Sequence, residues 1–192
     1  MNSFSPETYG PIVAELIREN DLPDLGPGHE NMVVRDQLRA LVPTRLFAEH
    51  TAIRDEQMAR CCLSGLWLRH NFLEESHTIS QEIHTSSGSY WHGVMHRREP
   101  DYSNAKYWFH KVGSHPVFPQ LCQVAHELAA SLPSNADCNF LANQGAWDPF
   151  AFIDLCQKLA KSPDADSLIL CQSIAAAEWN ILFDYCYQSA LG

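Results

Sequence analysis

Apolar residues recur with a helical period through the middle of the chain. Between Thr51 and His84 there is no proline and a single glycine. Within this run Leu68, Phe72, Ile79 and Ile83 fall in a narrow arc when residues are placed at about 100° per position. An unbroken pattern of this kind predicts one long helix, or two helices that are nearly collinear.

The N-terminal part of the chain predicts two shorter helices. Pro6 follows Ser5, a pair typical of a helix start with serine as the cap, and we expect this helix to end near Asn20. Its apolar stripe consists of Ile12, Val13, Leu16 and Ile17. The stretch Leu22–Glu30 packs two prolines and two glycines into nine residues, which predicts a loop. A second helix is expected over Met32–Leu41.

The second half of the chain predicts five more helices and no strand. A turn at Glu99–Asp101 separates the first two, and Asp148 followed by Pro149 is another cap-and-proline start. The expected helices cover Ser89–Arg98, Ser103–Val112, Pro116–Ser131, Pro149–Lys161 and Asp166–Gln188. We therefore predict an all-α, single-domain bundle over residues 1–192 with about six to eight helices.

Composition narrows the function classes. The chain has 192 residues, of which 45% are hydrophobic, so it can bury a sizeable core. Its net charge of −10 argues against a nucleic-acid surface, which needs a basic field. The N-terminus lacks a signal-peptide pattern, and no apolar run is long enough to span a membrane. We expect a soluble cytoplasmic protein.

The seven cysteines are odd in number, and most of them lie inside apolar helical patterns. This distribution predicts reduced, mostly buried thiols instead of a disulfide framework. The absence of a C-x-x-C pair argues against a thiolate zinc site.

Residues with unusual chemistry concentrate in the segment 70–118. Part of it has the spacing of one tetratricopeptide or Sel1-like helical hairpin, in which a glycine lets the two helices approach. The matching residues are Gly93, Tyr102, Ala105, Phe109 and Val112. A single unit indicates a repeat-like hairpin within a closed bundle, because repeats bury their cores by stacking. The segment also resembles an uncharacterised microbial protein family with a similar W-H-x-x-M-H-R-R-E-x-D-x-x-N-A-K-Y-W signature, a resemblance that implies no activity.

A metal site is the sharpest chemical hypothesis. His92 and His96 are four positions apart, so on a helix they share a face and can bind one ion. His77, from the preceding helix, is the best third imidazole. We predict a divalent ion (Zn, Fe or Mn) on these three histidines, with Glu99 and His96 as catalytic candidates. The alternative stays open that the histidines are packing residues, since ten histidines make coincidental spacing easy.

The preceding helix predicts a polar face that has two interpretations. Five side chains project within about 80° of one another: His70, Glu74, His77, Gln81 and His84. The face is either solvated, or it points His77 and Gln81 at the hairpin and completes a pocket with His92 and His96.

A charged cluster follows the histidines. It contains Arg97, Arg98, Glu99, Asp101, Asn104 and Lys106. It forms either a salt-bridge network joining the two hairpin helices or a site for an anionic ligand held by an arginine fork. Two consecutive arginines cannot share a face, so we expect at most one of them in a pocket. The ligand-binding candidates are Gln81, Arg97, Arg98, Asp101, Asn104, Lys106 and Trp108.

Two function classes follow. The first, slightly favoured because no nucleophile and base form a recognisable pair, is a non-catalytic binding module for a peptide or a small anionic ligand. The second is a small metal-assisted hydrolase that uses the histidine cluster.

Overall fold

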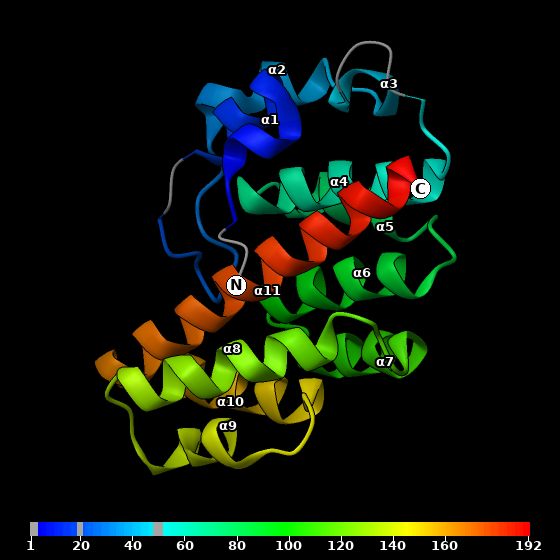
Figure 1. The fold of residues 1–192 in the computed structure, drawn as a ribbon. Helices are drawn as coiled ribbons and strands as arrows, with labels where there is room; N and C mark the ends of the chain where they lie inside the picture. Colours follow the sequence, from blue (N-terminus) through cyan, green and yellow to red (C-terminus); the bar gives the residue numbers. More distant parts are fainter. Residues whose placement is uncertain (1–3, 19–20, 48–51) are drawn as a thin grey trace.

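A computed structural model describes residues 4–18, 21–47 and 52–192, and within them it contains eleven α-helices and no strand (Figure 1). The all-α prediction is confirmed. The helices outnumber the prediction partly because two short ones, α3 (Pro43–Leu46) and α9 (Asn139–Asn143), form in stretches where no helix was expected. None of the helices in the described residues has the length and apolar character needed to cross a membrane.

The first helix differs from the prediction at its start. A 3₁₀ turn over Pro6–Tyr9 precedes α1 (Gly10–Ile17). The Ser5 hydroxyl donates to the Glu7 carboxylate and caps no backbone N–H. Ile12 is 40% exposed, so it does not belong to the buried stripe. The predicted helix end near Asn20 lies outside the described residues, as does the predicted start of the next long helix at Thr51. The predicted helix over Met32–Leu41 forms as a 3₁₀ turn, Met32–Val34, followed by α2 (Arg35–Arg39).

The predicted long or collinear central helix is wrong. The chain forms α4 (Glu56–Arg69) and α5 (Leu73–Ser80), and α5 folds back against α4. Asn71 adopts φ +67° at the reversal, a left-handed conformation that asparagine tolerates better than most residues. The returning helix is fixed by a hydrogen bond between the buried hydroxyls of Ser64 and Ser76, whose oxygens are 2.9 Å apart.

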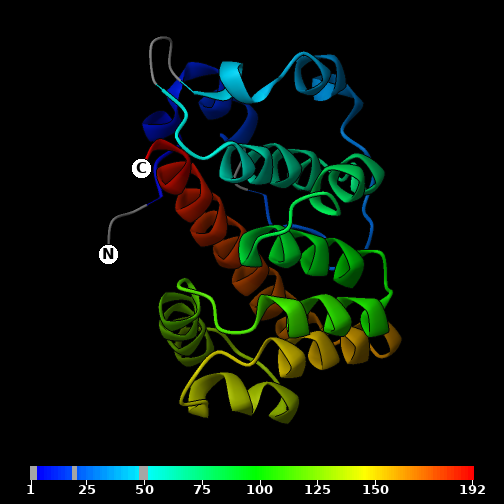
Figure 2. The same cartoon turned by 90° about the vertical axis from the view of Figure 1, so that its right-hand side faces the viewer.

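The expected hairpin is present. It consists of α6 (Ser86–Arg98) and α7 (Tyr102–Val112), and Asp101 caps α7 by accepting a hydrogen bond from the Asn104 N–H. The helices meet at Gly93, where an added Cβ would lie 2.8 Å from the Phe109 ring. Figure 2 shows α4, α6 and α7 stacked in succession, so α6 lies in the middle of the molecule and is almost entirely buried.

One long helix joins the two halves of the structure. The second half contains α8 (Phe118–Ser131), α10 (Pro149–Lys161) and α11 (Ala165–Leu191), close to the predicted bounds, and the Asp148 cap of α10 forms as expected. The 27-residue α11 crosses the stack diagonally and packs on both α4 and α8 (Figure 1). It contributes to both apolar clusters of the core. All seven cysteines are buried, as predicted.

Candidate metal centre

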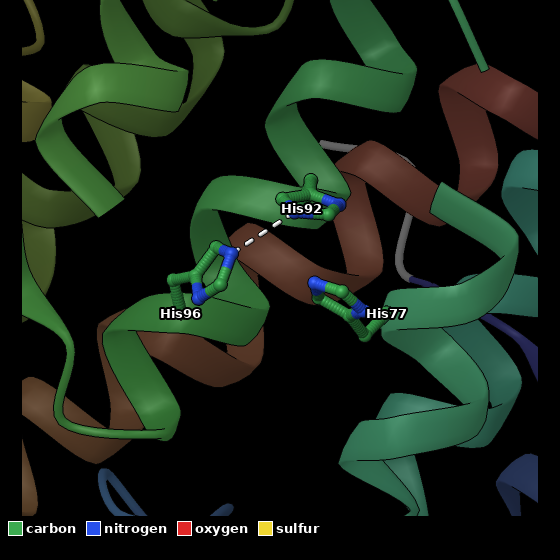
Figure 3. A group of neighbouring side chains, drawn as sticks. All are labelled: His77, His92 and His96. Carbon is green, nitrogen blue, oxygen red and sulfur yellow. Dashed lines mark hydrogen bonds between the residues drawn. The ribbon is translucent and has the colours of Figure 1, made fainter. Parts of the chain in front are cut away.

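Three histidines from two helices converge at one point. His77 comes from α5, and His92 and His96 come from successive turns of α6 (Figure 3). Each offers a ring nitrogen, and these nitrogens all lie within 4.8 Å of one another. The Nε2 atoms of His92 and His96 are 2.9 Å apart. Because α5 folds back and packs on α6, the structure brings together the three residues that the sequence predicted.

Ser80 orients the His92 ring. Its hydroxyl oxygen lies 2.9 Å from His92 Nδ1 and 3.3 Å from the carbonyl oxygen of His77. The hydroxyl lies within hydrogen-bond distance of both atoms and so holds the Nδ1 side of the ring in place. The other ring nitrogen, Nε2, lies toward His96.

Glu99 orients the His96 ring. Its carboxylate oxygen lies 2.9 Å from His96 Nδ1, and an ionised carboxylate can only accept, so Nδ1 carries the proton. The lone pair of His96 Nε2 is then available, and it faces His92 Nε2 at 2.9 Å. The amide of Asn104, 3.0 Å away, is placed to donate to His96 Nε2. The separation of the two Nε2 atoms fits either an N–H···N hydrogen bond between neutral rings or a metal ion bound by both nitrogens.

Burial keeps the two α6 histidines neutral. His92 and His96 are 2% and 5% exposed. Burial lowers the pKa of His92 to about 3, and the neighbouring His96, His77 and Lys111 act in the same direction. Burial also lowers the pKa of His96, against the opposing influence of Glu99. The neutral imidazole is the form that binds metal, so both environments favour the metal-binding form.

The cluster lies beneath the surface and is walled on one side. The indole of Trp108 packs on the His92 ring with centroids 4.0 Å apart, and the Lys111 ammonium lies over that indole. His77 is half-buried and Glu99 is exposed, so the site lies close to solvent.

The remaining polar-face residues do not join the cluster. His70 lies in the turn after α4 and bonds the Leu16 carbonyl oxygen at 2.9 Å. Gln81, Glu74 and His84 are exposed, and Gln81 lines a shallow cavity of about 480 Å³ with Trp108. The prediction of one continuous face is therefore wrong, because the helix that would carry it is broken at Asn71.

The charged cluster does not form the predicted network between the hairpin helices. Lys106 pairs with Asp154 on α10 at 2.5 Å, and Asp101 serves as a helix cap. Arg97 forms a two-pronged ion pair with Glu178 on α11, and Tyr90 donates to the same carboxylate.

Both arginines are buried. The expectation was that at most one would enter a pocket and the other would face water or an acid, and Arg97 faces the acid Glu178. Arg97 is 2% exposed and Arg98 is 6% exposed. Arg98 donates to the turn after α4 and to the loop that begins at Asp21. Each basic residue thus ties the hairpin to another part of the fold.

Sequence reasoning missed Ser80 and Glu178. Ser80 lies three positions after His77, so it was placed to share the side of α5 that faces α6. Glu178 is a lone acid in the otherwise apolar stretch 174–183 apart from Asn180, which is a signal for a buried, paired charge.

No family model, curated protein or solved structure matches this chain. The resemblance to a signature-bearing microbial family and to a Sel1-like unit therefore stays a prediction, and any function must be argued from the site itself.

Proposed function

We propose that the protein binds a divalent ion of the zinc class through His77, His92 and His96 and uses it in metal-assisted hydrolysis. The observation that carries the proposal is the convergence of ring nitrogens of the three histidines within 4.8 Å of one another, with the Nε2 atoms of His92 and His96 2.9 Å apart. These two nitrogens are close enough for one ion to lie about 2.0–2.1 Å from each.

The surroundings of the histidines support metal binding more than simple packing. Metal-binding histidines almost always donate their second ring nitrogen to an oxygen acceptor, which fixes the ring and its tautomer. Glu99 is such an acceptor for His96, and the Ser80 hydroxyl oxygen lies at the same 2.9 Å distance from His92 Nδ1. Imidazole ligands suit zinc, iron, copper and nickel.

The donor set favours hydrolysis over a purely structural metal. Structural zinc sites use four protein ligands, whereas three histidines leave one position open, as in catalytic sites. The ion would supply a Lewis acid there that activates a water molecule. In this arrangement Glu99 and Ser80 would position the ligands, and the Asn104 amide lies 3.0 Å from His96 Nε2.

The metal itself is tested on protein purified without a histidine tag. We expect about one zinc ion per chain by elemental analysis, and a tetrahedral visible spectrum after substitution with cobalt. His77→Ala should abolish both signals without unfolding the protein, because His77 is only half-buried. His84→Ala is the matched control, since His84 is exposed and outside the cluster. Zinc binding of equal strength in wild type and His77→Ala would contradict the site.

The hydrolytic part has its own assay. Zinc-loaded protein should cleave 4-nitrophenyl acetate or bis(4-nitrophenyl) phosphate faster than chelator-treated protein, and His77→Ala should lose this difference. If the protein binds zinc at the cluster but cleaves neither ester, the proposed metal site stands and these hydrolytic activities are ruled out.

A further inference from the structure

A cavity of about 320 Å³ lies on the other side of α6 from the histidines. It is enclosed by the loop starting at Asp21, the turn between α4 and α5, the end of α6, and α11. Val94 and Arg98 of α6 line it, and each is two positions after His92 or His96. Two positions correspond to about 200° around a helix, so the two pairs occupy nearly opposite faces.

The walls of the cavity combine apolar and polar side chains. Nine of the seventeen lining residues are apolar, among them Leu16, Leu68, Val94, Ala176 and Trp179. The cavity volume is at the lower end of the range typical of small-molecule sites. Apolar walls with a few charged groups are the usual composition of such a site.

Arg98 brings a positive charge to this cavity that no carboxylate neutralises within the described residues. Its guanidinium is buried and makes four hydrogen bonds, to the carbonyl oxygens of Gly26, Leu68 and Pro27 and to the amide oxygen of Asn71. All four acceptors are uncharged. A guanidinium has five N–H groups, so one donor on Nη1 has no partner there.

The pKa of Arg98 agrees with a buried guanidinium that lacks a paired carboxylate. Burial lowers its pKa to about 10, with only a partial opposing influence from Asp24. Arg97 also lines the cavity but differs from Arg98, because Glu178 compensates its charge. A buried charge without a counter-ion is costly, and an anionic ligand group removes that cost.

The acidic residues of the cavity lie toward solvent. Asp21 and Asp24 line it from the loop and are both exposed, whereas the two arginines of α6 are buried. Arg69 adds a further cation, which lies over the Trp179 ring. The interior is thus the positive end of the cavity.

We propose that this cavity binds a small monocarboxylic acid with an apolar body, with its carboxylate beside Arg98 and its body against Leu16, Val94 and Trp179. A bound carboxylate would use the remaining Nη1 donor and supply the missing counter-charge. This site does not depend on the proposed metal function, because its residues lie on a different face of α6.

The test measures binding calorimetrically with benzoate and hexanoate as probes, and with benzamide and hexanamide as their uncharged counterparts. Protein is treated with a chelator, so that no carboxylate can bind to a metal ion at the histidines. We expect at least one of the acids to bind about tenfold or more tightly than its amide, because only the acid compensates Arg98.

Location is tested with a matched pair of variants on α11. Ala176 lines the cavity and Ala177 does not, although both are partly buried. Ala176→Leu should weaken binding of the acid about tenfold or more by filling the space, whereas Ala177→Leu should leave it unchanged. Thermal melting of both variants establishes that they are folded.

Four results would overturn the proposal. They are the absence of binding of either acid at about 10 mM, equal affinity for acid and amide, acid binding that is unchanged in Ala176→Leu, and a preference for benzylamine. The last result would show that Asp21 and Asp24 determine the charge of the ligand. The His77→Ala variant should bind the acids as wild type does, which separates this site from the metal centre.

Discussion

The histidines and the arginines of α6 are similarly buried, but their polar atoms are satisfied in different ways. His92 and His96 have outer nitrogens fixed by Ser80 and Glu99, and inner nitrogens that face each other. Arg97 is fully matched by a carboxylate. The comparison teaches that dense reactive chemistry does not by itself mark a site. A candidate site is marked by a side chain that is held in place but still lacks a bonding partner or a counter-charge.

The largest effect is expected when the ion pair between Arg97 and Glu178 is broken. Glu178→Leu leaves the Arg97 charge and the Tyr90 hydroxyl buried without their partner, so we expect a loss of about 3–5 kcal/mol in the free energy of unfolding. Chemical denaturation measures this. The double variant Arg97→Met, Glu178→Leu should recover much of the loss, because an apolar pair can replace a buried ion pair. A double variant no more stable than the single one would argue against an unpaired charge as the cause.

The next prediction concerns the histidine cluster. Ser80→Ala should weaken zinc binding about 10- to 100-fold, because His92 loses the hydroxyl that holds its ring in place. A competition titration with a coloured chelator measures the affinity. Thr78→Ala is the control, since Thr78 is also a hydroxyl residue of α5 but is exposed. Equal weakening in both variants would indicate a general loosening of α5.

A buried histidine outside the cluster predicts how the stability of the protein depends on pH. His115 lies against Ser87, and burial lowers its pKa from 6.5 to about 4. Between these pH values the unfolded chain takes up a proton that the folded chain refuses, so the free energy of unfolding should fall as pH decreases from 6.5 toward 4. Denaturation curves of His115→Phe should show a shallower fall. An identical slope in the variant would assign the effect to other groups.

The smallest effect is expected at the exposed ion pair. Lys106→Met removes the partner of Asp154, and both side chains are substantially exposed, so the change should stay below about 1 kcal/mol. The same denaturation assay that is used for Glu178 measures it. A loss comparable to that of Glu178→Leu would show that burial does not explain the difference between the two ion pairs.

The sequence predicted most of the helices and the His92–His96 pair because both follow from local spacing, whereas His77 meets that pair only through the packing of α5 on α6. The α6–α7 hairpin and the bounds of α10 depend on turns, caps and a glycine that can be read from neighbouring residues. The reversal at Asn71 could not be read, because the helical pattern continues across it without proline or glycine. The hydroxyl contact that fixes the returned α5 joins two serines which, in sequence, are merely polar helix positions.

The partners of the arginines escaped prediction for another reason. Arg97 meets Glu178 across 81 positions of the chain, and Arg98 meets carbonyl oxygens of a loop about 70 positions earlier. Backbone acceptors carry no residue-type signal, and a distant carboxylate is identified only once the path of α11 is known. Contacts of this kind belong to the tertiary fold and not to any local pattern.

The diagonal course of α11 also has a consequence for how the protein is made. The helix packs on α4 and α8 and contributes to both apolar clusters, yet it follows every other helix in the chain. During translation the ribosome therefore releases nearly the whole α4–α10 assembly before the segment that covers its apolar surfaces is available. Completion of the core must wait until α11 has emerged, so the nascent chain exposes hydrophobic surface that chaperones can bind.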